Sequence, residues 1–234
     1  MAGVFYGVGV GPGDPELLTL KAVNVIRKAD IVIAPKTEKK EESTALSIAQ
    51  PFLKKDVQII KLVFPMVLDS ETWSNAWQDN KEIILNLLAA GKKVAFLTLG
   101  DPMFYSTYIY IFRMLTDCGY HIETIPGITA FCAIGSKLGY PLAEGNDVLS
   151  VIPATIEEGK LDAALQRSDN VVLMKVYKNY KQVVEKLDQH GLADNAVMIS
   201  CCGLENEQIV HDLKEIGEQK LNYLSTILAR KSNL

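Results

Sequence analysis

A glycine-rich segment near the start of the chain is the first place where the residue types suit a ligand. It reads Gly7-Val8-Gly9-Val10-Gly11-Pro12-Gly13-Asp14-Pro15 and lies between an apolar, β-type run and a helical pattern. Glycines let the backbone approach a ligand closely, and open α/β sheets bind ligands at the carboxyl ends of their strands. The spacing does not fit a dinucleotide fingerprint, and no Gly-Lys-Ser/Thr of a Walker loop follows. The segment alone predicts a tight turn that either binds a ligand or only connects two elements.

Two more turns of the same kind follow later strands. Gly100-Asp101-Pro102 and Pro126-Gly127-Ile128-Thr129-Ala130 each come directly after a short apolar run. Asp101 either accepts hydrogen bonds from an amine or hydroxyls of a ligand, or stabilises an Asx-type turn. Thr129 either contacts a ligand or caps the helix that follows. Three glycine-bearing loops at the carboxyl ends of strands in one sheet predict a ligand cleft.

Alternating strand and helix patterns position these loops. Five short apolar runs in the first half alternate with amphipathic stretches, which is typical of parallel βαβ units and predicts one five-stranded sheet. These runs are residues 4–10, 31–34, 57–63, 94–99 and 122–125. The polar stretch 139–147 contains Gly, Pro and Asn, so we place the domains at residues 1–140 and 141–234. Closely spaced later strands predict a mixed sheet in the second domain. The expected fold class is α/β, with two α/β domains.

Composition excludes several classes of protein. The chain has 234 residues, of which 48% are hydrophobic and 22% charged, as in ordinary globular proteins. Its formal net charge of -4 offers no broad attraction to nucleic acid or to an anionic membrane. No apolar stretch approaches a membrane span and no signal peptide precedes the first strand, so we expect a cytoplasmic protein. Four cysteines and three histidines show no metal-ligand spacing, and we expect no metal site.

Taken together, the three loops resemble the signatures of the tetrapyrrole methyltransferase family. Residues 9–22, GVGPGDPELLTLKA, are similar to the opening signature of the family. Gly100-Asp101-Pro102 and Pro126-Gly127-Ile128-Thr129-Ala130 resemble the second and third signatures, in the order that the family shows. The resemblance covers essentially the whole chain. It implies two α/β domains with a ligand cleft between them, S-adenosylmethionine as the methyl donor bound in that cleft, a tetrapyrrole substrate and a homodimer.

Carried over position by position, the resemblance assigns donor contacts to both halves of the chain. In the first half they are Pro12, Gly100, Asp101, Phe104, Thr129 and Ala130. In the second half they are Lys175 and Val176, which end a run similar to a cofactor-contacting strand, and Gly203, which follows Cys201-Cys202. Relatives often have Met where this chain has Lys175. That departure leaves the role of Lys175 open.

Weaker motifs point to one branch of the family. Ile152-Pro153-Ala154-Thr155 and Leu173-Met174-Lys175-Val176-Tyr177 resemble the C-20 methyltransferases of precorrin-2 and its cobalt complex. Tyr105-Ser106-Thr107 stands where uroporphyrinogen methyltransferases carry a Gly-Arg-Gly type segment. We therefore expect C-20 methylation of cobalt-precorrin-2 (cobalt-factor II) or precorrin-2 in cobalamin biosynthesis. The alternatives are methylation of uroporphyrinogen III or another corrin carbon, and a nucleotide-binding module without catalysis.

Methyl transfer from an activated donor demands positioning more than acid–base chemistry, so no catalytic dyad is expected. Tyr105, Ser106 and Lys36 are the candidates for orienting the substrate, although packing and helix capping explain the first two equally well. Lys36, Lys39 and Lys40 supply cations for a polycarboxylate acceptor, or else form a solvated loop face. Trp73 and Trp77 share one helical face, and we interpret them as core or dimer contacts.

Overall fold

The computed structural model describes residues 2–36, 42–65, 70–217 and 220–231, without the side chains of residues 70–74. The chain divides into two compact units, Met1–Thr129 and Ala130–Leu234. Helix α5 (Ala130–Leu138) therefore belongs to the second unit, whereas the sequence-based boundary at residue 140 lies after this helix. The physical reason is that α5 packs against strand β10 (Ser225–Arg230) of the second unit.

The first unit contains a five-stranded sheet in which every strand pairs in parallel with its neighbours. Its strands are β1 (Val4–Gly9), β2 (Ile31–Lys36), β3 (Gln58–Val63), β4 (Lys93–Thr98) and β5 (His121–Ile125). They lie in the order β3-β2-β4-β1-β5, so β4, β1 and β5 are adjacent. The predicted parallel sheet is confirmed. The loops after β1, β4 and β5 consequently leave the same edge of this sheet from three adjacent strands.

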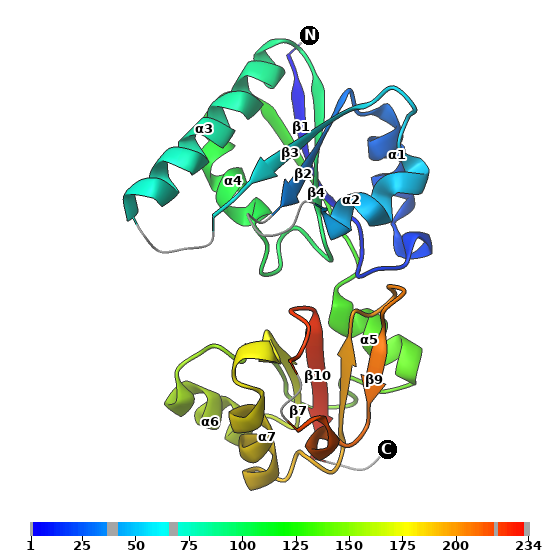
Figure 1. Cartoon of the computed structure of the whole chain (residues 1–234), viewed down its shortest axis with the longest axis vertical. Coiled ribbons are helices and arrows are strands. Elements are labelled where there is room, and N and C mark those ends of the chain that lie inside the picture. Colours follow the sequence, from blue (N-terminus) through cyan, green and yellow to red (C-terminus); the bar gives the residue numbers. More distant parts are fainter. Residues whose placement is uncertain (1, 37–41, 66–69, 218–219, 232–234) are drawn as a thin grey trace. The chain divides into compact units, whose positions relative to one another are not determined.

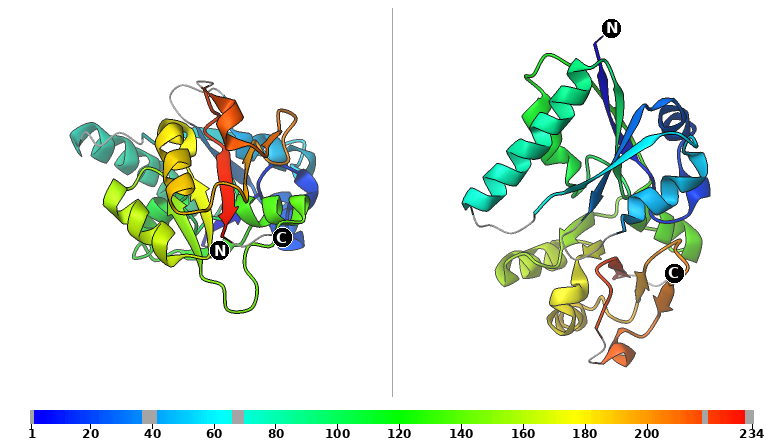
Figure 2. Two further views of the ribbon diagram at one scale, coloured as in Figure 1. Left: turned by 90° about the horizontal axis from the view of Figure 1, so that it is seen from below. Right: turned by 45° about the horizontal axis from the view of Figure 1, so that its top comes forward.

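Helices cover both faces of this sheet (Figure 1). The helices are η1 (Pro15–Leu17), α1 (Leu20–Lys28), α2 (Thr44–Ala49), η2 (Gln50–Phe52), α3 (Ser70–Ala89) and α4 (Tyr108–Leu115). Figure 2 shows α3 along one face and α1 along the other in its right-hand view. The helical segment between β1 and β2 is split into η1 and α1, because Asp14 caps η1 and Thr19 begins α1 by accepting a hydrogen bond from Ala22 N.

The core under α3 and α4 is aromatic. Trp77 is 2% exposed, and its ring lies 4.9 Å from that of Phe64 and 5.5 Å from that of Tyr110. Trp77 is therefore a core residue, one of the two roles expected for it. Nothing is described of the Trp73 side chain, and Lys39 and Lys40 lie outside the described residues.

The second unit contains a mixed sheet in the order β6-β7-β10-β8-β9. The remaining strands are β6 (Leu149–Pro153), β7 (Asn170–Met174), β8 (Ala196–Ser200) and β9 (Gln208–Val210). Strand β6 is parallel to β7, whereas β10 is antiparallel to both β7 and β8, which confirms the predicted mixed sheet. The carboxyl ends of β6, β7 and β8 thus share one edge with the amino end of β10.

Two helices cover one face of the second sheet, namely α6 (Glu158–Arg167) and α7 (Tyr180–Gln189) (Figure 1). Two short helices, η3 (Val176–Lys178) and η4 (Leu213–Ile216), complete this unit. Leu161 and Leu165 from α6 and Val183 and Leu187 from α7 are buried in the same apolar cluster. Each sheet therefore has its own core.

Within the described residues, no helix combines the length and the apolar character that crossing a membrane requires.

Candidate functional site

The three glycine-bearing loops of the first unit meet backbone to backbone. A Cβ added at Gly127 would stand 2.1 Å from the carbonyl oxygen of Gly100, and one added at Gly9 would stand 2.6 Å from the Gly127 nitrogen. Gly100 N donates to Gly11 O at 2.8 Å, and Gly11 N donates to Gly100 O at 3.3 Å. We call this contact of Gly9, Gly11, Gly100 and Gly127 the glycine cluster. This close approach of the backbones is possible only because side chains are absent here.

Asp101 ties the second loop to the third. Its Oδ1 accepts a hydrogen bond from Met103 N at 2.8 Å, and its Oδ2 accepts one from Gly127 N at 3.0 Å. The first contact is the Asx-type turn that the sequence allowed. The second holds the loop after β5 against the loop after β4. A carboxylate oxygen has two lone pairs, so each oxygen of this half-buried side chain retains one lone pair for a further hydrogen-bond donor.

Other predicted donor contacts of the first unit lie on the same loops. Pro12 is buried next to the glycine cluster in sequence, and Phe104 is half-buried with its ring 4.7 Å from that of Tyr105. Thr129 Oγ1 is buried and has no hydrogen-bond partner among the described residues. The expected cap of the next helix, which starts at Ala130, is therefore not formed by this hydroxyl in the described structure. A buried hydroxyl without a partner is destabilising, so a ligand group or water that satisfied it would stabilise the protein.

The three candidates for orienting the substrate differ in their surroundings. Tyr105 is 47% exposed and has a left-handed backbone, with φ of 46°. Ser106 is buried, and its hydroxyl donates a hydrogen bond to the carbonyl oxygen of Pro102. Lys36 is the last residue of β2, which β4 separates from β1. The structure therefore places Tyr105 and Ser106 on the loop after β4, and Lys36 two strands away from β1.

The matching edge of the second unit carries strained backbone. Lys175 follows β7 with φ of 59°, and Cys201 follows β8 with φ of 56°. Together with Tyr105 they are the non-glycine residues with positive φ in the part of the chain that the structure describes. Left-handed backbone at a non-glycine residue costs of order 1–3 kcal/mol and is concentrated at ligand-binding sites. All three occur shortly after the carboxyl end of a strand, where the fold class binds ligands.

Val176 and Gly203 complete the predicted contacts of the second unit. The side chain of Val176 is wholly buried in the core formed with α6 and α7. Only the backbone of Val176 is thus left to reach a ligand. Gly203 has φ of 77°, and its N–H donates to Glu207 Oε2 at 2.6 Å. The hydrogen bond fixes the turn that follows β8.

Glu207 is a site residue that the sequence reasoning missed. Its other oxygen, Oε1, lies 2.5 Å from Lys137 Nζ on α5. Burial raises the pKa of Glu207, but the Lys137 ammonium and the Gly203 N–H outweigh burial and hold that pKa below its usual value. The carboxylate is therefore charged and fixed. Nothing in the sequence distinguishes Glu207 from its neighbour Glu205, because the contact depends on where α5 packs.

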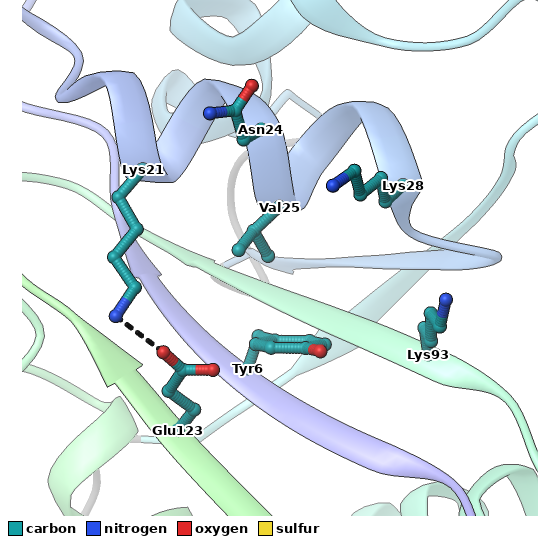
Figure 3. Close-up of a pocket in the computed structure, with 7 residues that line it drawn as sticks. All are labelled: Tyr6, Lys21, Asn24, Val25, Lys28, Lys93 and Glu123. Atoms are coloured by element: carbon teal, nitrogen blue, oxygen red, sulfur yellow. Dashed lines mark ion pairs between the residues drawn. The ribbon is translucent and has the colours of Figure 1, made fainter. Parts of the chain in front are cut away.

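A separate pocket lies on the α1 side of the first sheet (Figure 3). It is lined by Tyr6, Lys21, Asn24, Val25, Lys28, Lys93 and Glu123. Lys21 Nζ pairs with Glu123 Oε1 at 2.5 Å. Lys93 is the first residue of β4, so this pocket does not lie at the carboxyl edge where the glycine cluster is found. Among the described residues, no group of three or more His, Cys, Asp or Glu side chains is arranged to hold a metal ion.

Solved structures of known proteins share the fold of the chain. A cobalt precorrin-4 methyltransferase superimposes with a TM-score of 0.75 at 21% identity, covering 97% of this chain and 94% of that one. Uroporphyrin-III C-methyltransferase from Thermus thermophilus, solved in complex with S-adenosylhomocysteine, gives a TM-score of 0.70 at 21% identity, covering 97% of each chain. At these identities the likeness concerns the fold alone.

Proteins found by sequence similarity share a higher identity with the chain than these solved structures do. The chain is 36% identical to cobalt-precorrin-2 C(20)-methyltransferase of Salmonella typhimurium, over 99% of this chain and 98% of the relative. It is 34% identical to precorrin-2 C(20)-methyltransferase of Sinorhizobium sp, over 97% of this chain and 94% of that protein. The family model of the Tetrapyrrole (Corrin/Porphyrin) Methylases matches residues 4–217. With the signature loops joined in one glycine cluster and the whole chain aligned, the protein belongs to the tetrapyrrole (corrin/porphyrin) methylase family.

Proposed function

We propose that the protein is an S-adenosylmethionine-dependent methyltransferase that methylates C-20 of cobalt-precorrin-2 (cobalt-factor II) or of precorrin-2 in cobalamin biosynthesis. The observation that carries the proposal is the glycine cluster, in which the three signature loops pack so closely that an added Cβ at Gly9 or Gly127 would clash with backbone atoms. The choice of acceptor is supported by two relatives, both named for C-20 methylation, that align over nearly the full chain.

The described residues fit the methyl donor. The carbonyl oxygens of Gly11 and Gly100 each accept one hydrogen bond within the cluster and retain a second lone pair. Asp101 offers lone pairs for hydroxyls or an amine, and the Thr129 hydroxyl has no hydrogen-bond partner among the described residues. Pro12, Gly100 and Phe104 are proposed contacts on the same loops, and Ala130, the first residue of α5, is a further proposed contact. The bound donor supplies a methyl group on a positively charged sulfur, which needs no enzyme nucleophile.

The work of the chain is therefore to hold donor and acceptor in line. Correct positioning alone can lower a barrier by roughly 7–11 kcal/mol, more than a typical acid–base contribution. Tyr105 is the proposed orienting residue of the first unit, since its ring is half exposed on the loop after β4. Ser106 supports that loop through its bond to Pro102, and Lys36 is proposed to attract the acceptor from a neighbouring strand end.

For the second unit we propose donor contacts through Lys175, the backbone of Val176, and Gly203. The support is their position after β7 and β8 and the strained backbone of Lys175. We further propose a cytoplasmic homodimer, as the family resemblance implies. Light scattering of the purified protein tests the dimer, and cell fractionation tests the location.

An anaerobic assay tests the proposed activity. Purified protein is incubated with S-adenosylmethionine and with cobalt-loaded or metal-free precorrin-2, and the product is analysed by mass and by NMR. We expect one added methyl group, located at C-20. A methyl group at another carbon, or transfer only to uroporphyrinogen III, would move the protein to another branch of the family. Donor binding without transfer to any tetrapyrrole would indicate a binding module.

A further inference from the structure

The second unit contains a pocket that the proposed donor contacts do not use. It begins directly after Lys175 and is built on η3 and the first turn of α7. Its lining residues are Tyr177, Lys178, Asn179, Tyr180, Lys181, Gln182, Gly217, Lys220 and Leu221. We call it the tyrosine–lysine pocket. Because β7 ends one residue before Lys175, the pocket lies at the same edge of the sheet as the strained turns.

The charge of this pocket opposes that of the chain. Three of its lining residues are lysines, and none of the described residues that line it is an aspartate or a glutamate. The protein as a whole has a net charge of -4. The pocket of Figure 3 provides a contrast, since its lining includes a glutamate, Glu123, besides three lysines. A local excess of ammonium groups selects an anionic ligand.

Aromatic rings accompany the ammonium groups. The rings of Tyr177 and Tyr223 lie 5.3 Å apart at an interplanar angle of 59°, and Tyr223 is 54% exposed. Lys178 Nζ lies 5.8 Å from the centre of the Tyr177 ring. A ring face beside a cation suits a ligand that is both flat and anionic, because the ring contacts the flat surface while the ammonium pairs with a carboxylate.

The wall of the pocket is held in place by buried polar contacts. Tyr180 Oη donates to Leu213 O at 2.5 Å, and Asn179 Nδ2 donates to Ala154 O at 3.1 Å. Burial, with a smaller contribution from Asp212, raises the pKa of Tyr180 to about 12, so its hydroxyl remains a donor at neutral pH. The Asp212 carboxylate itself accepts a hydrogen bond from Lys214 N and does not line the pocket. The lysines are thus presented from a fixed frame.

We infer that the tyrosine–lysine pocket binds peripheral carboxylates of the tetrapyrrole acceptor, with Lys178 and Lys181 as positioning residues and Tyr177 against the edge of the macrocycle. The inference rests on the proposed function, which supplies a flat polycarboxylate as the substrate. It assigns acceptor recognition to the second unit, apart from Lys36 and Tyr105 on the first.

Binding of uroporphyrin, which carries an acetate and a propionate on every pyrrole, tests the inference without catalysis. The wild-type protein is compared with Lys178→Gln and with the double variant Lys178→Gln/Lys181→Gln by fluorescence titration. Lys160→Gln is the matched control, because this lysine on α6 of the same unit is exposed and pairs only with its neighbour Glu157 at 3.7 Å in the contacts described. We expect Kd to rise about three- to fivefold per lysine removed, as exposed ion pairs contribute up to about 1 kcal/mol each.

Salt and kinetics sharpen the test. Wild-type affinity should fall as salt rises, and the double variant should be less salt-sensitive. In the methyl transfer assay both variants should raise KM for the tetrapyrrole while kcat and the Kd of S-adenosylhomocysteine stay unchanged.

Two results would overturn the inference. One is a wild type that does not bind uroporphyrin, and the other is an equal Kd for Lys178→Gln, Lys160→Gln and the wild type. Failure of the proposed function is a separate result, namely no methyl transfer by the wild type to any acceptor. In that case the uroporphyrin titration still decides whether the pocket binds carboxylates.

Discussion

The two units build the corresponding edges of their sheets in opposite ways. At the edge of the first unit, glycines from three loops touch through their backbones, and Asp101 ties two of these loops together. At the edge of the second unit, two turns each contain a non-glycine residue with left-handed backbone, Lys175 and Cys201. Glu207, four residues beyond Gly203, fixes the turn after β8 and is itself paired with Lys137 of α5. The first edge is tight because side chains are missing, whereas this turn of the second edge is held by a side chain.

This difference determines how each edge should respond to mutation. Glycine is required where another backbone is close enough to exclude a Cβ, so the first edge should not tolerate added atoms. Strained turns held by neighbours should accept glycine easily and should weaken when their supports are removed. Substitutions at both edges should therefore have contrasting effects.

The largest effect is expected from Gly127→Ala. The new Cβ would stand 2.1 Å from Gly100 O, and backbone atoms on both sides leave it no room. Overpacking costs about 1–3 kcal/mol, and we expect the upper end of that range together with loss of S-adenosylhomocysteine binding. Chemical denaturation and calorimetry measure the two effects. Gly159→Ala on α6, where nothing lies within 4 Å of the new Cβ, is the control and should leave both unchanged or slightly raise stability.

Asp101→Ala should have the next largest effect. The substitution removes the acceptor of two backbone N–H groups and releases the loop after β5 from the loop after β4. Hydrogen bonds to charged groups contribute about 1.5–3 kcal/mol, so the affinity for the methyl donor should fall roughly ten- to hundredfold. The circular dichroism spectrum should be preserved. Asp117→Ala, an exposed aspartate of the same unit, provides the baseline. Equal donor affinities for the two variants would contradict the role given to Asp101.

Glu207→Gln tests the support of the second edge and its pH dependence. The variant loses the ion pair with Lys137 and weakens the bond from Gly203 N, so we expect a loss of about 1–2 kcal/mol at neutral pH. Because the folded-state pKa of Glu207 lies below the ordinary value of 4.5, the wild type gains this stability above pH 4.5. The gain disappears as the pH falls through the lower folded-state pKa. Unfolding curves of both proteins should therefore converge under acid, and a constant difference would refute the assignment.

The smallest effect is expected at Lys175. Lys175→Gly relieves left-handed backbone at φ of 59°, while the added freedom of the unfolded chain offsets much of the gain. Lys175→Ala keeps the strain. We therefore expect the glycine variant to be more stable than the alanine variant by about 1 kcal/mol, as measured by thermal unfolding. A more stable alanine variant would show that the turn is not strained.

The fold could be predicted from local patterns to a large extent. Continuous apolar runs indicated the parallel strands of the first unit, and closely spaced runs indicated the mixed sheet of the second. The pattern did not reveal that Thr19 starts a new helix inside the stretch 15–28. It also did not reveal that α5 joins the second unit, since that depends on packing against β10 and not on linker composition.

Residues of the candidate site could be predicted from the sequence only where the residue type itself indicates the role. The glycine loops were visible because glycine is the residue that close backbone contact requires. Burial of the Val176 side chain, the inward bond of Ser106 and the support from Glu207 all depend on tertiary neighbours. Periodicity and motif spacing carry no information about such neighbours.

A crystal structure of the protein with S-adenosylhomocysteine bound tests most directly whether the glycine cluster holds the methyl donor. We expect density for the ligand against the glycine cluster, with a hydroxyl or amine of the ligand within hydrogen-bond distance of Asp101 and a polar group facing Thr129 Oγ1. Density in the pocket lined by Lys21, Lys28 and Lys93, with the three loops empty, would contradict this expectation.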